Sequence, residues 1–188
     1  LILRLPDFSF DGPGMAPFSR DIENFWYKLS KIILTEPSPN MYNRRLRWSH
    51  EVLQDLINAG VNTTGHESKR LLKFCNSFNI AENDGLEYLR IFFNAFCEYF
   101  GISVTEFDGL EEHYISFFES SSRRIERLQN EGVQYIGNID AFKKVFKQRN
   151  GITVSTYHGV KGAEYDTVIA FALLQDYIPH FSDSNGII

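Results

Sequence analysis

The chain has 188 residues, of which 43% are hydrophobic and 23% are charged, and its formal net charge is −5. This length is enough for one domain of ordinary size, and the hydrophobic fraction is normal for a globular core, which excludes a disordered chain. The negative charge excludes the basic surface of an autonomous DNA-binding domain, so any contact with nucleic acid has to be local.

The cysteines and the hydropathy pattern exclude further classes. Cys75 and Cys97 lie in separate predicted helices without the spacing of a zinc site or disulfide framework, so we expect buried thiols in a reducing cytosol. No stretch approaches the roughly 18 consecutive apolar residues of a membrane span. We therefore expect a cytoplasmic protein without membrane contacts. Because the chain does not begin with Met, we also expect a fragment of a longer protein.

The first elements are an irregular segment and a helix. Residues 1–18 contain several Pro and Gly residues, which predicts an irregular segment rather than a helix or strand. A first helix is predicted from Ser19, as its N-cap, to about Glu36, because apolar residues starting with Ile22 recur on one face. Pro37 would end this helix.

Helices dominate the chain as far as residue 147. The spacing of apolar residues and the positions of Gly and Pro predict further helices at about 41–59, 67–78, 85–100, 105–130 and 139–147. Gly101 should end the helix over 85–100. Thr105, followed three residues later by Asp108, suggests a capped start for the next helix, which the sequence allows to be broken.

Only after residue 150 do the apolar residues recur with the period of β-strands instead of that of helices. Two strands are predicted, Ile152–Thr156 and Thr167–Leu173, joined by a tight polar turn. Because two unaccompanied strands are marginal in water, we expect them to join a parallel sheet whose other strands lie outside this chain. The predicted fold is mainly α, with a helical subdomain at 19–150 followed by part of an α/β domain at 151–188.

The turn between the predicted strands concentrates polar chemistry, and functional residues are common on loops mounted on rigid strands. It reads Thr-Tyr-His-Gly-Val-Lys-Gly-Ala-Glu-Tyr over residues 156–165. This turn resembles motif V of UvrD/Rep-type superfamily 1 helicases, roughly T-x-H-x-x-K-G-x-E-[FY] between two apolar strands. Six residues match that pattern: Thr156, His158, Lys161, Gly162, Glu164 and Tyr165. The resemblance covers about residues 152–180, and Ala163 departs from the leucine usual in the family.

The resemblance implies a place in a larger motor. Residues 19–150 would be the helical insertion of such a helicase, and residues 151–188 would be part of its second RecA-like domain, a strand–turn–strand that carries motif V. The full enzyme would bind ATP and magnesium and would act in DNA repair. It would unwind DNA together with the remaining helicase domains, on single-stranded DNA or a junction with duplex.

The resemblance also assigns the residues of the turn. Thr156 and His158 would face single-stranded DNA. Lys161, Gly162 and Glu164 would lie near the nucleotide, with Glu164 accepting a hydrogen bond from the ribose. The chain has no GxxxxGK[ST] phosphate loop, so we expect no catalytic residue, metal site or bound cofactor in the isolated chain, which should be inactive.

Basic residues also gather in three other stretches, 44–47, 123–127 and 142–149. Clusters of this kind could follow a duplex backbone without reading its sequence. For 142–149, an amphipathic helix with its apolar residues inward and its lysines in water is the favoured interpretation.

Two other interpretations of the chain stay open. It could belong to a subunit of a helicase–nuclease recombination complex, which flanking sequence would reveal. It could also be a non-enzymatic helical interaction module whose terminal strands resemble motif V by accident. For His158 alone, the alternative role is a hydrogen bond to nearby backbone at the end of a strand.

Overall fold

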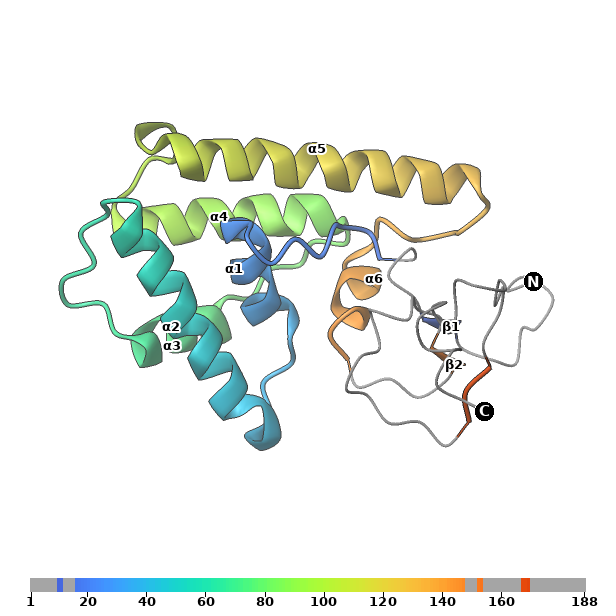
Figure 1. Cartoon of the computed structure of the whole chain (residues 1–188), viewed down its shortest axis with the longest axis horizontal. Coiled ribbons are helices and arrows are strands. Elements are labelled where there is room, and N and C mark those ends of the chain that lie inside the picture. The colour runs from blue at the N-terminus through green and yellow to red at the C-terminus, as the bar shows by residue number, and fades with distance from the viewer. Residues whose placement is uncertain (1–9, 12–15, 148–151, 154–166, 170–188) are drawn as a thin grey trace, which may run out of the picture. The chain divides into compact units, whose positions relative to one another are not determined.

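The fold is mainly helical in this computed structural model (Figure 1). The structure describes residues 10–11, 16–147, 152–153 and 167–169. The chain divides into two compact units, Leu1–Val154 and Ser155–Ile188. The helices that the structure describes all belong to the first unit.

The helices follow one another with short connections. In chain order they are α1 (Phe25–Leu34), η3 (Pro39–Met41), α2 (Tyr42–Asn58), α3 (Ser68–Ser77), α4 (Gly85–Phe100), η4 (Val104–Glu106), α5 (Asp108–Asn130) and α6 (Ile139–Lys144). The predicted bounds of α2, α3 and α4 are confirmed to within one residue. Gly101 ends α4 in the left-handed conformation, with φ of 63°, as its position predicted.

Helix α1 begins later than predicted, because its N-cap is Asn24 and not Ser19. The side-chain Oδ1 of Asn24 accepts hydrogen bonds from the backbone N–H groups of Trp26 (3.0 Å) and Tyr27 (3.1 Å). These groups have no partner inside the helix, so the cap stabilises its first turn. Ile22, predicted on the apolar face of the helix, lies before its start and is 64% exposed.

Helix α5 also begins differently from the prediction. Thr105 is not its cap: the Thr105 and Ser103 hydroxyl oxygens lie 2.9 Å apart within the turn of η4, and α5 starts three residues after Thr105. The helix then runs without a break to Asn130. The capping pattern was therefore a poor guide here, because a second hydroxyl competes for the Thr105 side chain.

Aromatic side chains build the core of the first unit. The Trp26 ring is fully buried, its centroid lies 4.7 Å from that of Phe93 on α4, and its Nε1 donates a hydrogen bond to the carbonyl O of Leu110 (2.8 Å). Phe18, ahead of α1, is fully buried against Phe142 of α6 (5.3 Å between centroids). These contacts confirm that the many aromatic residues serve as large core side chains.

A parallel strand pair joins the two ends of the helical part. Strand β1 (Phe10–Asp11) pairs with β2 (Ile152–Thr153), with Phe10 opposite Ile152. The segment 1–18, expected to be irregular, thus contains a short strand. Parallel neighbours need a long crossover connection. Here the helices α1–α6 form that connection.

Of the two predicted strands, the described residues of the first form a strand and those of the second do not. For Ile152–Thr156, the described residues Ile152 and Thr153 do form a strand. For Thr167–Leu173, the described residues Thr167–Ile169 have no regular secondary structure, and Val168 and Ile169 are 74% and 72% exposed. A strand needs a neighbour for its backbone hydrogen bonds, and no described residue pairs with these three. The rest of both predictions lies outside the described residues.

Candidate functional site

The residues predicted to bind DNA and nucleotide lie outside the described part of the chain. These residues are Thr156, His158, Lys161, Gly162 and Glu164. Their roles therefore stay predictions. The nearest described residues before the motif belong to β2, which ends at Thr153, three residues before Thr156.

Arg45, a member of the first basic stretch, is a structural residue. Its side chain is buried, and its Nε and Nη2 atoms donate to the carbonyl O of Ile32 at 3.3 and 2.9 Å. Burial lowers the pKa of Arg45, and the nearby Cys75 thiol acts in the opposite direction. Arg45 thus joins α2 to the last turn of α1, where a cation is favourable. It does not form part of a DNA-binding surface.

The other residues of this stretch contribute to a basic surface on α2 and α3. Apart from the buried Arg45, residues 42–78 carry five Lys and Arg against three Asp and Glu, a surplus of two positive charges in a chain whose net charge is −5. A shallow hollow between the two helices is lined by Asn43, Leu46, Arg47, His50, Glu67, Ser68 and Lys69. Its two cationic side chains, Arg47 and Lys69, outnumber its one carboxylate, Glu67, so the hollow would attract an anion more readily than a cation.

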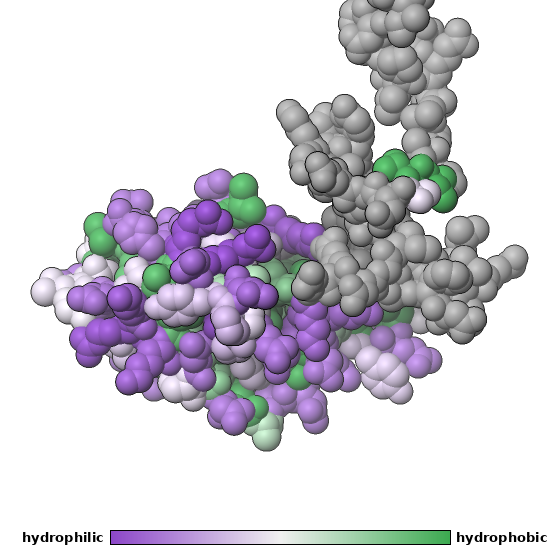
Figure 2. Space-filling model, turned by 90° about the horizontal axis from the view of Figure 1, so that it is seen from below, coloured by the Kyte–Doolittle hydropathy of each residue, from purple (hydrophilic) through white to green (hydrophobic). Residues whose placement is uncertain are grey.

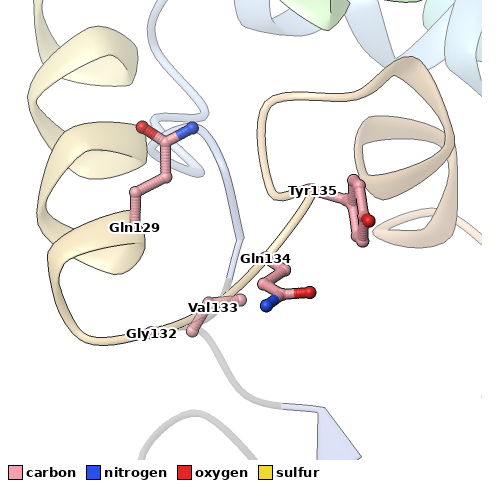
Figure 3. A pocket seen from close by; sticks show the side chains of 5 residues that line it. All are labelled: Gln129, Gly132, Val133, Gln134 and Tyr135. Carbon is pink, nitrogen blue, oxygen red and sulfur yellow. The ribbon is translucent and has the colours of Figure 1, made fainter.

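A second hollow lies where α5 leads into the loop before α6. Gln129 of α5 and Gly132, Val133, Gln134 and Tyr135 of the loop line it (Figure 3). Tyr135 is 73% exposed and has a φ of 59°, an uncommon value for a residue other than Gly. The lining offers amide and phenol groups for hydrogen bonds. Among the described residues of this lining, none carries a carboxylate, imidazole or thiol that could act in catalysis at neutral pH.

In the third basic stretch, 142–149, the described apolar residues face the core as the amphipathic interpretation predicts, but α6 ends at Lys144 and residues 145–147 form a turn instead of the predicted continuation of the helix. Phe142 is fully buried, while Val145 and Phe146 pack partly buried against the same core. Lys144 is exposed, and the Nζ of Lys143 lies 5.6 Å from the ring centroid of Tyr88. One face of α6 therefore serves the core, and its lysines lie at the surface.

The arginines of the second stretch have partners on or near α5. Arg123 lies 4.0 Å from a carboxylate oxygen of Glu119, and Arg127 lies 3.7 Å from one of Glu131. Both pairs are exposed and join residues four apart on the helix. Such pairs contribute little to stability and reduce the local positive charge.

The two cysteines are buried thiols, as predicted. Burial raises the pKa of Cys75 to about 12 and that of Cys97 to about 11, so neither is a reactive thiolate at neutral pH. Within the described ranges, no group of His, Cys, Asp and Glu side chains could hold a metal ion.

The surface adds two observations. The face that Figure 2 shows is largely hydrophilic, with hydrophobic residues scattered among polar ones rather than gathered in one patch. Among the helices of the described residues, none has the length and hydrophobicity needed to cross a membrane.

Comparison of the chain with protein-family models, with curated proteins and with solved structures gave no match. Any function of this chain is therefore inferred from its own residues.

Proposed function

We propose that this chain is part of an ATP-dependent DNA helicase of the UvrD/Rep type and acts in the cytoplasm. The observation that carries the proposal is the turn at residues 156–165, where six residues match motif V in type and spacing. On this proposal Thr156 and His158 contact single-stranded DNA. Lys161, Gly162 and Glu164 lie at the nucleotide.

The strand pairing at the base of the helical part supports the proposal. Strands β1 and β2 are neighbours in a parallel pair, and the whole run of helices connects them. Parallel pairs of this kind occur mostly in α/β sheets whose connections are helical. A helical insertion between two strands of a RecA-like sheet would produce this topology, and β2 leads directly toward residues 156–165.

The turn would then couple two ligands. A hydroxyl and an imidazole on one side can donate to DNA phosphates, and a carboxylate a few residues later can accept from a ribose. Phosphoryl transfer itself needs a phosphate cradle, a carboxylate that holds magnesium and a charge-stabilising arginine. The remaining domains of the parent helicase would supply these groups, with ATP and magnesium.

The test separates the two sides of the turn in the full-length parent protein. The double variant Thr156→Ala/His158→Ala removes the proposed DNA contacts and should reduce DNA-stimulated ATP hydrolysis and unwinding more than nucleotide binding. Glu164→Gln removes one charged acceptor, which typically costs about 1.5–3 kcal/mol. It should weaken nucleotide binding and leave DNA affinity without nucleotide unchanged.

Circular dichroism must first show that both variants are folded. If folded variants affect neither ligand selectively, the assignment of the turn is wrong and a non-enzymatic interaction module becomes the better interpretation. Nuclease activity in the parent protein or its complex would instead indicate a helicase–nuclease subunit.

A further inference from the structure

Tyr135, in the loop between α5 and α6, is held in an unfavourable backbone conformation. Among the described residues it is the one residue other than Gly with a positive φ, at 59°. In this left-handed conformation the Cβ atom crowds the backbone, so residues with large side chains adopt it rarely. The Tyr135 ring is also 73% exposed, so burial of the ring does not offset the strain. Strained residues of this kind gather at ligand sites.

Hydrogen bonds on both sides fix the backbone around Tyr135. Before it, the N–H of Val133 donates to the carbonyl O of Leu128 (2.9 Å), which ties the loop to the end of α5. After it, the N–H of Asn138 donates to the carbonyl O of Tyr135 itself (3.0 Å), and the neighbouring Ile136 is buried. The exposed ring is therefore a preorganised surface, and preorganisation lowers the entropic cost of binding a ligand.

Tyr135 shares its hollow with two amide side chains. Gln129 contributes one from α5, and Gln134 contributes the other from the loop (Figure 3). The Nε2 atom of Gln129 lies 3.9 Å from the position of a Cβ atom at Gly137, so this side chain reaches from the helix to the loop. Each amide both donates and accepts hydrogen bonds. None of the described lining residues is charged, so the lining has no cation to select a phosphate and no carboxylate to select a metal ion.

These groups together fit a planar, uncharged ring with hydrogen-bond donors and acceptors on its edge. An aromatic side chain offers a face for stacking, and every nucleobase has a π-face that can lie on it. The edge of an unpaired base presents donors and acceptors side by side, which amide side chains match. A base inside a duplex does not fit, because its neighbours in the stack already cover its faces.

We propose that Tyr135, Gln129 and Gln134 bind an unpaired nucleobase. The base stacks on the Tyr135 ring, and the two amides form hydrogen bonds with its edge. It can belong to a free nucleoside or nucleotide, or to a single-stranded nucleic acid. The site does not use residues 156–165, so this proposal and the proposed helicase function can fail independently.

The test uses adenosine as the probe and the 188-residue chain. Adenosine should shift the ring signals of Tyr135 in NMR spectra to saturation, and ribose should not, because it lacks the base. Tyr135→Ala removes the stacking surface and should weaken adenosine binding at least about fivefold. Tyr135→Phe keeps the ring and should bind adenosine like the unmodified chain. Gln129→Ala/Gln134→Ala keeps the ring, removes both amides and should weaken adenosine binding about fivefold.

Tyr135→Gly distinguishes a lost site from a damaged fold. Glycine adopts a positive φ without strain, so the urea midpoint of this variant should equal or exceed that of the unmodified chain. Its adenosine binding should nevertheless fall as much as that of Tyr135→Ala. Tyr42→Ala is the matched control, because it removes an exposed tyrosine of α2. It should bind adenosine like the unmodified chain.

Three outcomes would overturn the site: Tyr135 signals that adenosine does not move to saturation, an equal response to ribose, or equal adenosine binding by Tyr135→Ala and the unmodified chain. A short single-stranded oligodeoxyadenylate then distinguishes the source of the base. Weaker binding of this oligonucleotide by Tyr135→Ala indicates a base in a single strand. Unchanged binding of the oligonucleotide, together with weakened adenosine binding, indicates a free nucleoside or nucleotide.

Discussion

The ring of Phe142 occupies the space that a side chain at Gly85 would need. A Cβ atom at Gly85 would overlap three carbon atoms of this ring, which is fully buried. Two backbone hydrogen bonds hold the start of α4 close to the start of α6. The N–H of Gly85 donates to the carbonyl O of Gly137 (2.7 Å), and the N–H of Ile139 donates to the carbonyl O of Asn83 (2.9 Å). The beginnings of α4 and α6 are therefore held against each other through a glycine.

Gly85→Ala should destabilise the protein by about 1–3 kcal/mol, because the added methyl group overpacks a filled core. Urea unfolding measures this change. Gly109→Ala is the matched control: a Cβ atom at Gly109 in α5 has no neighbour within 4 Å, so its stability should be unchanged or slightly higher. The double variant Gly85→Ala/Phe142→Leu should lose less than the sum of the single changes. Equal effects at the two glycines would contradict the described contact.

Substitution of Asn24 tests how α1 is held. The Oδ1 of Asn24 caps α1, and its Nδ2 donates to the carbonyl O of His113 on α5 (2.8 Å). Asn24→Ala should cost about 1–2 kcal/mol, since it removes the cap. Asn24→Ser keeps a capping oxygen but loses the hydrogen bond to His113. Its unfolding midpoint in urea should therefore lie between those of the unmodified protein and of Asn24→Ala. A Ser variant as unstable as the Ala variant would show that the cap contributes little.

The buried thiols predict a loss of stability at alkaline pH. The pKa values of Cys75 and Cys97 in the folded protein are raised to about 12 and about 11, against 9.0 for an ordinary thiol. The folded state holds these protons more tightly than the unfolded state does. The contribution of the two thiols to the free energy of unfolding is therefore complete below pH 9 and is lost between pH 9 and 12. Unfolding free energies should fall by roughly 1 kcal/mol per thiol between pH 8 and 10. Cys75→Ala should be less stable at pH 8 but lose less on going to pH 10, and an equal loss would contradict this explanation.

The isolated chain should not hydrolyse ATP. Its sequence has no phosphate-binding loop of the GxxxxGK[ST] type, and phosphoryl transfer needs such a cradle together with magnesium. Phosphate release in the presence of single-stranded DNA measures this directly. ATP turnover above a matched blank that persists through repurification would contradict the proposal that the remaining helicase domains supply the catalytic groups.

DNA binding by the isolated chain should be weak and dependent on salt. With a net charge of −5 and a local basic surface on α2 and α3, the dissociation constant should lie at about 10⁻⁴ to 10⁻⁶ M and rise with salt. Fluorescence anisotropy over a salt series tests this expectation. Arg47→Gln/Lys69→Gln should weaken binding and lower the salt dependence, whereas Arg123→Gln should change neither. Tight binding that ignores salt would indicate a base-reading surface.

The sequence predicted elements well where local signals decide them. Helix α4 was predicted from its spacing of apolar residues and from Gly101, and both signals lie within the element. The start of α1 was missed, because Ser19 and Asn24 are both suitable N-cap residues, and the cap that forms, Asn24, also has a contact with His113, 89 residues away. Strand β1 was missed for the same reason, since its partner β2 lies near the other end of the helical part.

Predictions of the surface and of the site were also limited where they depend on contacts between residues far apart in the sequence. The stretch Arg44-Arg45-Leu46-Arg47 looks uniformly basic, and only the packing of α2 on α1 shows that Arg45 turns inward to the carbonyl O of Ile32. The basic surface that remains depends on α3 lying beside α2. The motif at residues 156–165 is defined by its local spacing, and its roles stay predictions because those residues lie outside the described structure.

The pairing of β1 with β2 also sets an order of folding. Phe10 and Ile152, which lie opposite each other, are 142 positions apart in the chain, and closing so long a loop in an unfolded chain is entropically unfavourable. The helices make contacts over shorter separations and can form without the strands. We therefore expect the helical part to fold first and to bring the two strands together. On this expectation the strand pair is the last contact to form and the first to open.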